Sequence, residues 1–329
     1  MTLPILSRNQ TLGEVGEFAL IAAITADLAP SAEVVIGPGD DAAVLDIAGP
    51  VLTSVDVLVE GVHFRRDWSE AHDVGRKAVA VNVADIQAMG GRAVGLVVGF
   101  SAPGDLPVAW ALDFAAGVRE ECATAGVALV GGDTTRSRDI TVSVTVLGSL
   151  DGRPPVLRSG SRPGDVVALA GRTGWAAAGL VVLSRGFRSP RAVVEAQRVP
   201  AVPYGAGVAA ADAGASAMID VSDGLLADLG HVAVASGVVI DLRTDAFEVP
   251  EPLQVVSAAT GTDPLALMLT GGEDHALAAT FPASVALPSG WRPIGTVRER
   301  EPDEEAQVLV DRTSWVGAAG FDHFRGGRR

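Results

Sequence analysis

Short apolar runs alternate with helical patterns along this chain, and this alternation constrains the fold more than any other feature. Runs of strand length are separated by longer stretches in which apolar residues recur every three or four positions. The strand-like runs of the first half are AAVLDI, PVLTSVDVLV, AVGLVVGF, GVALVGG and ITVSVTVLGSL, and the helical patterns are AHDVGRKAVAVNVADIQAM and VAWALDFAAGVREECATA. The pattern predicts an α/β fold with mixed sheets.

The chain divides into two halves at a segment rich in turn-forming residues. Its 329 residues fit two domains of about 150 residues each. Between Leu150 and Asp165 the sequence DGRPPVLRSGSRPGD is rich in Pro, Gly, Ser and Arg, which is typical of a surface crossing between domains. We therefore expect an N-terminal domain over residues 1–150 and a C-terminal α/β domain over residues 151–329.

Each half begins with a recognisable element. An amphipathic helix is expected over GEFALIAAITADLA, with Phe18, Ile21, Ile24 and Leu28 on its apolar face. The second half restarts with a strand at DVVALAG, followed by a glycine-containing loop at GRTGWAAAG and a helix. Further strands are expected at SAMIDVS and GVVIDL, with the helix DGLLADLGHVAVAS between them.

Composition excludes several classes of protein. The net charge of −15, with Lys77 as the only lysine, argues against an extended nucleic-acid surface. The longest nearly uncharged stretch, residues 93–104, is far shorter than the roughly 20 apolar residues of a membrane span. The N-terminus lacks a basic segment followed by an apolar one, so a cytoplasmic location is expected. The single cysteine, Cys122, is expected to be a structural thiol.

Aspartates stand where the apolar strand-like runs begin or end, and they carry the main chemical signal. They are Asp40, Asp41, Asp56, Asp85, Asp133, Asp220 and Asp223. Carboxylates at strand ends meet at one edge of a sheet, and Mg²⁺ prefers a few carboxylates together with substrate phosphates. The alternative for each residue alone is a turn or a helix N-cap, and Asp223 could cap the helix that follows it. The set as a whole favours a nucleotide site containing several metal ions.

No common nucleotide or hydrolase motif accompanies these aspartates. The sequence has no GxxxxGK[ST], GRTGWAAAG does not satisfy GxGxxG, and neither HExxH nor GxSxG occurs. Glycines beside the aspartates, such as Gly132, could bring backbone N–H groups close to phosphates, although loop formation is the better explanation of the glycines taken alone. Arg158 is a candidate phosphate clamp or, with equal weight, a solvated linker arginine.

The chain resembles the thiamine-monophosphate kinase family, within the superfamily of aminoimidazole-ribonucleotide synthetase and selenophosphate synthetase. The segments that match in order and spacing are GEFALI, GDDAAVL, VDVLVEGVHF, KAVAVNVADIQAMG, LVGGDTTR, RSGSRPGD, IDVSDGLLADLGH, LTGGEDHAL and GFDHF, over residues 14–324. The resemblance implies a two-domain α/β fold and a homodimer in which the N-terminal sheets pair. It also implies transfer of the γ-phosphoryl group of ATP to thiamine monophosphate, with Mg²⁺ ions.

The same resemblance implies roles for individual residues. Metal-binding positions are matched by Asp41, Ser54, Asp56, Asp85, Asp133, Asp220 and Asp223, with Asp40 beside them and Val55 contributing only backbone oxygen. Nucleotide contacts are matched by Gly132, Asp133, Arg158 and Ser222, and substrate contacts by His63, Glu273 and Phe321. The family often has threonine at Val55 and tyrosine at His275, and both departures leave the number of metal ions open.

The expected chemistry needs no catalytic side chain of its own. The nucleophile is an oxygen of a phosphate that is already largely ionised near neutral pH, so no general base is required. The protein must hold two anionic groups in line and offset their repulsion.

The alternatives are another enzyme of the superfamily or a non-catalytic nucleotide-binding regulator. A selenophosphate synthetase would ordinarily have a reactive cysteine near its N-terminus, and this chain has none there. A regulator would have lost several of the aspartates, which are all present.

Overall fold

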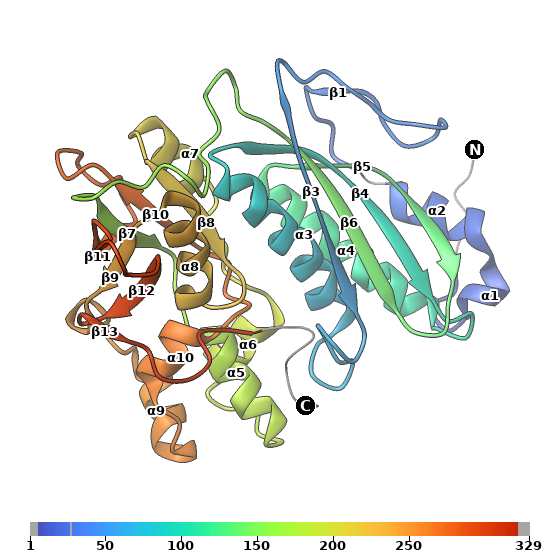
Figure 1. Ribbon diagram of the computed structural model, residues 1–329. Helices are drawn as coiled ribbons and strands as arrows, with labels where there is room; N and C mark the ends of the chain where they lie inside the picture. The colour runs from blue at the N-terminus through green and yellow to red at the C-terminus, as the bar shows by residue number, and fades with distance from the viewer. Residues whose placement is uncertain (1–5, 27, 322–329) are drawn as a thin grey trace. The chain divides into compact units, whose positions relative to one another are not determined.

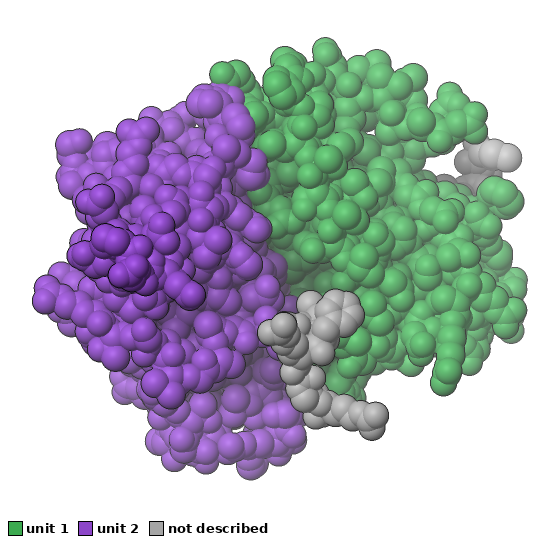
Figure 2. Space-filling view, in the orientation of Figure 1, with its two compact units in different colours: residues 1–86, 92–152 green, residues 87–91, 153–329 purple. Residues whose placement is uncertain are grey.

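The computed structural model describes residues 6–26 and 28–321. The chain folds into two compact units, coloured separately in Figure 2. Unit 1 contains residues 1–86 and 92–152, and unit 2 contains residues 87–91 and 153–329. A short segment of the first half therefore belongs to the second unit, which a single cut in the sequence could not have indicated.

Unit 1 is built on a four-stranded mixed sheet. The strands, in the order β3-β6-β4-β5 across the sheet, are β3 (Val51–Val59), β6 (Thr141–Ser149), β4 (Arg92–Ala102) and β5 (Ala128–Arg136). β4 and β5 are parallel, and β6 is antiparallel to both β3 and β4. Helices α3 (Ala71–Ala88) and α4 (Val108–Ala125) lie side by side against the sheet in Figure 1. Both helices are confirmed, and α3 ends one residue before the predicted pattern does.

Two glycines allow α3 and α4 to approach closely. A Cβ atom on Gly75 would lie 2.1 Å from the carbonyl oxygen of Phe114, and one on Gly117 would lie 2.0 Å from that of His72. Near this contact the Arg76 guanidinium pairs with the buried Glu121 carboxylate at 2.8 Å. Only glycine at these positions lets the two helix backbones meet, so this packing fixes where α3 presents its polar residues.

The N-terminal elements differ in part from expectation. Helices α1 (Leu12–Val15) and α2 (Glu17–Thr25) are followed by a two-stranded hairpin of β1 (Val34–Ile36) and β2 (Val44–Leu45). The prediction that Phe18 belongs to a buried helix face is wrong, because Phe18 is 84% exposed and Leu20 is the buried residue of α2. The helix is apolar on nearly all sides, so spacing alone could not identify its buried face.

Unit 2 contains a seven-stranded sheet. Its strands, in spatial order, are β13 (Thr313–Ser314), β12 (Gln307–Val310), β9 (Val239–Leu242), β11 (Trp291–Arg298), β7 (Val166–Ala170), β10 (Ala276–Phe281) and β8 (Ala217–Val221). All neighbours are antiparallel except β12 and β9. The helices are α5 (Trp175–Ser184), α6 (Arg191–Arg198), α7 (Ala206–Asp212), α8 (Leu225–Ser236), α9 (Glu251–Thr260) and α10 (Pro264–Thr270), and η1 (Thr244–Ala246) is a 3₁₀ turn.

The expected strands at β7, β8 and β9 and the expected helix α8 are confirmed. The expected loop GRTGWAAAG is shorter than predicted, because α5 begins inside it at Trp175.

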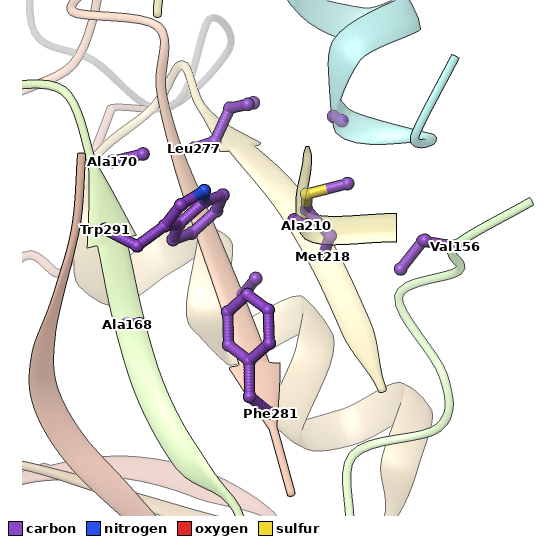
Figure 3. Packing of buried hydrophobic residues seen from close by; sticks show 10 residues of the cluster. Val156, Ala168, Ala170, Ala210, Met218, Leu277, Phe281 and Trp291 are labelled. Atoms are coloured by element: carbon purple, nitrogen blue, oxygen red, sulfur yellow. The ribbon is translucent and has the colours of Figure 1, made fainter. Parts of the chain in front are cut away.

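One buried cluster explains why residues 87–91 belong to unit 2. Phe281 and Trp291 meet edge to face with ring centroids 5.4 Å apart, and Ala88 belongs to the same cluster, whose Phe281 and Trp291 are labelled in Figure 3. The Met89 carbonyl accepts a hydrogen bond from the Val156 N–H at 3.1 Å. The Gln87 side chain accepts one from the Gly205 N–H at 3.0 Å. These contacts hold the segment on the second core.

The structure bears on the expected role of Cys122 and on the expected lack of a membrane span. Cys122 is buried in α4, and burial raises the pKa of its thiol to about 12, so it is a structural thiol as expected. Within residues 6–26 and 28–321 no helix is long and apolar enough to span a membrane.

Candidate functional site

Three of the predicted metal-binding residues lie together where β3 passes α3. Ser54 and Asp56 alternate with Val55 along β3, so they lie on the opposite face of the strand from it. The Ser54 hydroxyl donates a hydrogen bond of 2.5 Å to the Asp85 carboxylate on α3. Val55 is 56% exposed. The strand period therefore separates Val55 from the carboxylates, and its side chain contributes nothing to them.

Asn82 is a member of this group that sequence reasoning missed. Its side-chain oxygen accepts a 2.9 Å hydrogen bond from the Asp56 N–H, and its amide donates to the Ala78 carbonyl at 2.9 Å. Asn82 is buried and stands three residues before Asp85, hence on the same face of α3. The available signal was an asparagine inside the apolar stretch AVAVNVA of this helix.

Asp133 lies on β5, in register with Gly99 of β4, and is exposed. The residue before it must be glycine, since a Cβ atom on Gly132 would lie 2.2 Å from the Val98 carbonyl oxygen. Gly132 is thus explained by the close approach of β4, so contact with a ligand is not required to account for it.

Asp40 and Asp41 lie in the loop between β1 and β2, and both are exposed. The Asp41 N–H donates to the Asp40 carboxylate at 2.9 Å. This local bond orders the loop.

His63 lies just after β3, in a fixed orientation. Its Nδ1 accepts a 3.1 Å hydrogen bond from the Val59 N–H, so the neutral ring carries its proton on Nε2. Its carbonyl accepts from Lys77 at 3.1 Å, and that lysine is only 2% exposed. The single lysine of the chain therefore supports the segment that carries His63.

In unit 2, backbone hydrogen bonds bring three loops together. The Glu273 N–H donates to the Ser222 carbonyl at 2.7 Å, and the Phe321 N–H donates to the Asp223 carbonyl at 3.0 Å. Glycines permit these contacts, since a Cβ atom on Gly272 would lie 2.5 Å from the Ser222 oxygen and one on Gly320 would lie 2.7 Å from the Asp223 oxygen. Four predicted site residues thereby become neighbours, although they come from three segments that are far apart in sequence.

Three buried polar side chains, Asp220, Asp228 and His275, lie close in sequence to the residues of these loops. His275 Nδ1 lies 3.2 Å from the Asp220 carboxylate, and both residues are buried. Asp228 accepts hydrogen bonds from the Asp223 and Gly224 N–H groups at 3.1 and 3.0 Å. Burial, and then the charge of Asp220, raise the pKa of Asp228 to about 7. The N-cap interpretation of Asp223 is wrong, because Gly224 is the N-cap of α8 and makes no side-chain cap bond.

Asp274, between two site residues, anchors the start of α5. Its carboxylate accepts the Ala176 N–H at 2.9 Å, and its second oxygen is buried without a partner among the described residues. The residues on either side adopt left-handed backbone conformations, with φ of 70° at Glu273 and 50° at His275. Burial raises the pKa of Asp274 to about 7. Sequence reasoning took the motif as a substrate contact and missed this structural role.

The raised pKa predicts a pH-dependent stability. Between about pH 4 and pH 7 the folded state keeps a proton on Asp274 that the unfolded state releases, so the free energy of unfolding falls as pH rises through this window. Between pH 4 and pH 8 we expect this effect to lower the free energy of unfolding of the wild type by an amount on the order of 3 kcal/mol, and we expect the decrease to be absent in Asp274→Asn. Urea unfolding of both proteins at several pH values gives the two free energies. The same pH dependence of the free energy of unfolding in both proteins would contradict the prediction.

Comparison with known proteins identifies the family. Residues 39–150 match the model of the AIR synthase related protein N-terminal domain, and residues 162–287 match that of the C-terminal domain. The thiamine-monophosphate kinase of Mycobacterium tuberculosis is 48% identical over 322 residues, which cover 97% of this chain and 95% of that protein. The chain belongs to the thiamine-monophosphate kinase family. The kinase of Corynebacterium glutamicum is 38% identical over 97% of this chain and 96% of that protein.

Solved structures agree with this family membership. A structure described as AaThiL complexed with AMPPCP and TMP has a TM-score of 0.77 and 30% identity, over 97% of this chain and 100% of that one. A thiamine monophosphate kinase from Aquifex aeolicus has a TM-score of 0.74 and 32% identity, over 80% of this chain and 89% of that one. The expected two-domain α/β fold of the thiamine-monophosphate kinase family is therefore confirmed.

The family implies Mg²⁺, and the oxygen ligands present suit it. In the described parts of the chain no three His, Cys, Asp or Glu side chains form a group that could hold a metal ion by themselves. Mg²⁺ usually takes one or two carboxylates and completes its shell with water and substrate phosphates, so a protein-only cage is not required. Ser54, Asp56 and Asp85 in unit 1, and Asp223 in unit 2, fit that pattern of oxygen ligands, whereas Asp220 is buried with its carboxylate against His275.

Two family positions remain to be placed, Arg158 and the C-terminal segment GFDHF. Arg158 is exposed, and its carbonyl accepts a hydrogen bond from Ser236 at 3.2 Å. Its guanidinium has no ion-pair partner in the described residues. Residues 322–324 of GFDHF lie outside the described residues.

Proposed function

We propose that this chain transfers the γ-phosphoryl group of ATP to thiamine monophosphate, giving thiamine diphosphate. The observation that carries the proposal is the near full-length identity of 48% to a thiamine-monophosphate kinase, joined to the convergence of Ser222, Asp223, Glu273 and Phe321 in unit 2. The structure described as AaThiL with AMPPCP and TMP supports the same pair of ligands. The product is formed by attack of one phosphate on another, which makes the enzyme a phosphotransferase.

The residues of this chain act by positioning. Mg²⁺ bound at Asp40, Asp41, Ser54, Asp56, Asp85, Asp133, Asp220 and Asp223 would neutralise negative charge on the phosphates. Asn82 and Ser54 fix the Asp56 backbone and the Asp85 carboxylate, so these oxygens are in place before a ligand arrives. Gly132, Arg158 and Ser222 are proposed nucleotide contacts.

The proposed binding site for thiamine monophosphate matches the positive charge of its thiazolium ring. Glu273 supplies a carboxylate and Phe321 an aromatic face, and both favour the cationic thiazolium ring. His63, whose ring is oriented by the hydrogen bond from the Val59 N–H to its Nδ1, is the third proposed substrate contact. No side chain acts as a general base in this scheme, because the attacking phosphate oxygen is already ionised near neutral pH.

A homodimer remains part of the proposal. It is supported by an apolar stripe on the edge strand β3, where Val51, Val55 and Val57 are 49%, 56% and 42% exposed. Pairing of this sheet face with a second copy would cover the stripe. A monomer in sedimentation velocity at the assay concentration would exclude it. The cytoplasmic location, and the absence of nucleic-acid and membrane partners, stay predictions.

A coupled assay tests the proposed function. Purified protein with ATP and Mg²⁺ is expected to phosphorylate thiamine monophosphate and to leave free thiamine unchanged. Omission of Mg²⁺ with added EDTA is expected to abolish turnover. Activity on free thiamine alone would refute the proposal, and activity only with another phosphorylated substrate would favour a different enzyme of the superfamily.

A further inference from the structure

The only lysine of the chain is buried. Lys77 lies in α3 with 2% of its surface exposed, and the residues one helical turn away on either side, Val74 and Val81, are buried as well. An ammonium group is costly to bury unless polar partners replace its water. The chain uses arginine at every other strongly basic position, so a lysine here needs a local reason.

The ammonium group of Lys77 reaches from α3 to a backbone carbonyl. Its Nζ donates a 3.1 Å hydrogen bond to the carbonyl oxygen of His63, which lies in the turn after β3. A lysine stem is narrow and apolar and ends in a compact charge, whereas the guanidinium of arginine is a wide, planar group. Lysine therefore suits a place where a donor must pass between buried side chains to reach one carbonyl.

Three hydrogen bonds hold His63 in this turn. The His63 N–H donates to the Val59 carbonyl at 3.0 Å, and the Val59 N–H donates to Nδ1 of the His63 ring at 3.1 Å. The third bond is the one from Lys77. The first two bonds join residues of the strand end and its own turn, whereas the third joins the turn to α3. Lys77 thus determines where the turn and its ring lie relative to the helix.

The same helix also holds the proposed metal-binding part of β3. Asn82 accepts a hydrogen bond from the Asp56 N–H, and Asp85 accepts one from the Ser54 hydroxyl. Helix α3 therefore contacts the middle of β3 through Asn82 and Asp85 and the turn beyond its end through Lys77. One helix carries the supports of both the proposed metal ligands and the proposed substrate contact.

We propose that Lys77 is a positioning residue for thiamine monophosphate, which acts by holding His63 in the place where His63 contacts the substrate. The inference rests on the proposed function and adds to it a residue that does not touch the substrate itself. Because the metal-binding part of β3 has its own supports in Asn82 and Asp85, loss of the lysine should act on thiamine monophosphate and leave ATP and Mg²⁺ unaffected.

Lys77→Met tests the proposal, because methionine keeps an apolar stem and removes the donor. We expect the KM for thiamine monophosphate, and its Kd measured by calorimetry without ATP, to rise about tenfold, since a charged donor to the His63 carbonyl is lost. The KM for ATP and the Mg²⁺ concentration that gives half the maximal rate should stay within about twofold. An unchanged KM for thiamine monophosphate, or an equal rise in the KM for ATP, would overturn the proposal.

Arg66→Met is the matched control. Arg66 follows His63 by three residues, and its guanidinium pairs with the Glu60 carboxylate at 2.6 Å. The Arg66 side chain is 49% exposed, and such surface pairs contribute little to stability. Arg66→Met should therefore leave both KM values within about twofold. An effect on thiamine monophosphate as large as that of Lys77→Met would overturn the proposal, because loss of any cation near the turn would then explain both.

A double-mutant cycle separates positioning through His63 from a general loss of structure. If Lys77 acts through His63, adding Lys77→Met to His63→Ala should raise the KM for thiamine monophosphate no further than His63→Ala does alone. Additive effects of the two substitutions would overturn the proposal.

The wild-type protein offers a test that does not depend on how a variant folds. Because Lys77 is the only lysine, acylation by an amine-directed reagent and mass spectrometry report on it separately from the N-terminal amine. Saturating thiamine monophosphate is expected to slow acylation of Lys77 several-fold, since bound substrate stabilises the turn that must open, and to leave the N-terminal amine unchanged. The same acylation rate in a protein that phosphorylates thiamine monophosphate would overturn the proposal.

Nuclear magnetic resonance of the ligand-free protein separates the positioning of His63 from the activity. With ¹⁵N-labelled histidine, the signals lost in His63→Ala identify the His63 ring. Lys77→Met is expected to shift its Nδ1 signal, because the bond from the Val59 N–H is formed less often once the turn is released. An unshifted signal would overturn the proposal. If the signal shifts but the wild type does not phosphorylate thiamine monophosphate, the proposed function fails and the support of His63 by Lys77 stands.

Discussion

Asp133→Asn is expected to lower kcat/KM for thiamine monophosphate phosphorylation by about 10³-fold or more while the protein stays folded. Asp133 is exposed on β5, and asparagine has the same shape, so the strand pairing with β4 should be retained. The amide lacks the charge with which a carboxylate would bind Mg²⁺ and help offset the repulsion between two phosphates. Steady-state kinetics with saturating Mg²⁺, together with circular dichroism, measure both effects.

The control for this variant is another exposed aspartate of the same unit. Asp139 lies in the turn between β5 and β6 and matches no family position. Asp139→Asn should leave kcat/KM within about twofold. Near-normal turnover by Asp133→Asn would count against a metal-assisted mechanism built on these aspartates.

Gly117→Ala is expected to lower the free energy of unfolding by about 3 kcal/mol, at the upper end of the usual cost of overpacking. The added Cβ would lie 2.0 Å from the His72 carbonyl oxygen, and it meets backbone, which cannot rotate away. Helix α3 would have to move from α4, and because α3 carries Asn82 and Asp85, activity should also fall. Urea unfolding followed by circular dichroism gives the change in stability.

The same substitution at Gly230 is the matched control. Gly230 also lies within a helix but has nothing within 4 Å of an added Cβ, so Gly230→Ala should raise the free energy of unfolding of its unit by about 0.5–1 kcal/mol. A loss below about 0.5 kcal/mol for Gly117→Ala would show that α3 and α4 can separate at little cost.

The glycine-rich motifs illustrate how far sequence reasoning reached. The sequence placed Gly132 and Gly272 beside candidate site residues but could not distinguish ligand contact from local packing. The structure gives a steric reason for both, because a β strand or a neighbouring loop occupies the position of the missing side chain. By contrast, Gly230 lies inside a helix with nothing within 4 Å of an added Cβ, so local packing does not require a glycine there.

Buried polar residues were the main omission. Asn82 and Asp274 each bind a backbone N–H group of another element, whereas Asp228 binds the N–H groups of Asp223 and Gly224 at the start of its own helix. The roles of Asn82 and Asp274 depend on partners that the fold brings near, so residue type and spacing cannot reveal them. The exposure of Phe18 could not be predicted either, because which side of the apolar helix α2 is buried depends on what packs against it.

The sequence by itself determined the α/β character and the positions of α3, α4 and α8. These features depend on local periodicity, which short segments carry. The prediction that the aspartates stand at strand ends is wrong for three of them, because Asp85 lies in α3 and Asp56 and Asp133 lie inside β3 and β5. Only the tertiary structure decided which residues become neighbours: the assignment of residues 87–91 to unit 2, the contact of Ser54 with Asp85, and the meeting of the Asp223, Glu273 and Phe321 loops. Those contacts join distant parts of the chain, and they form only because buried cores and close glycine contacts fix the elements in place.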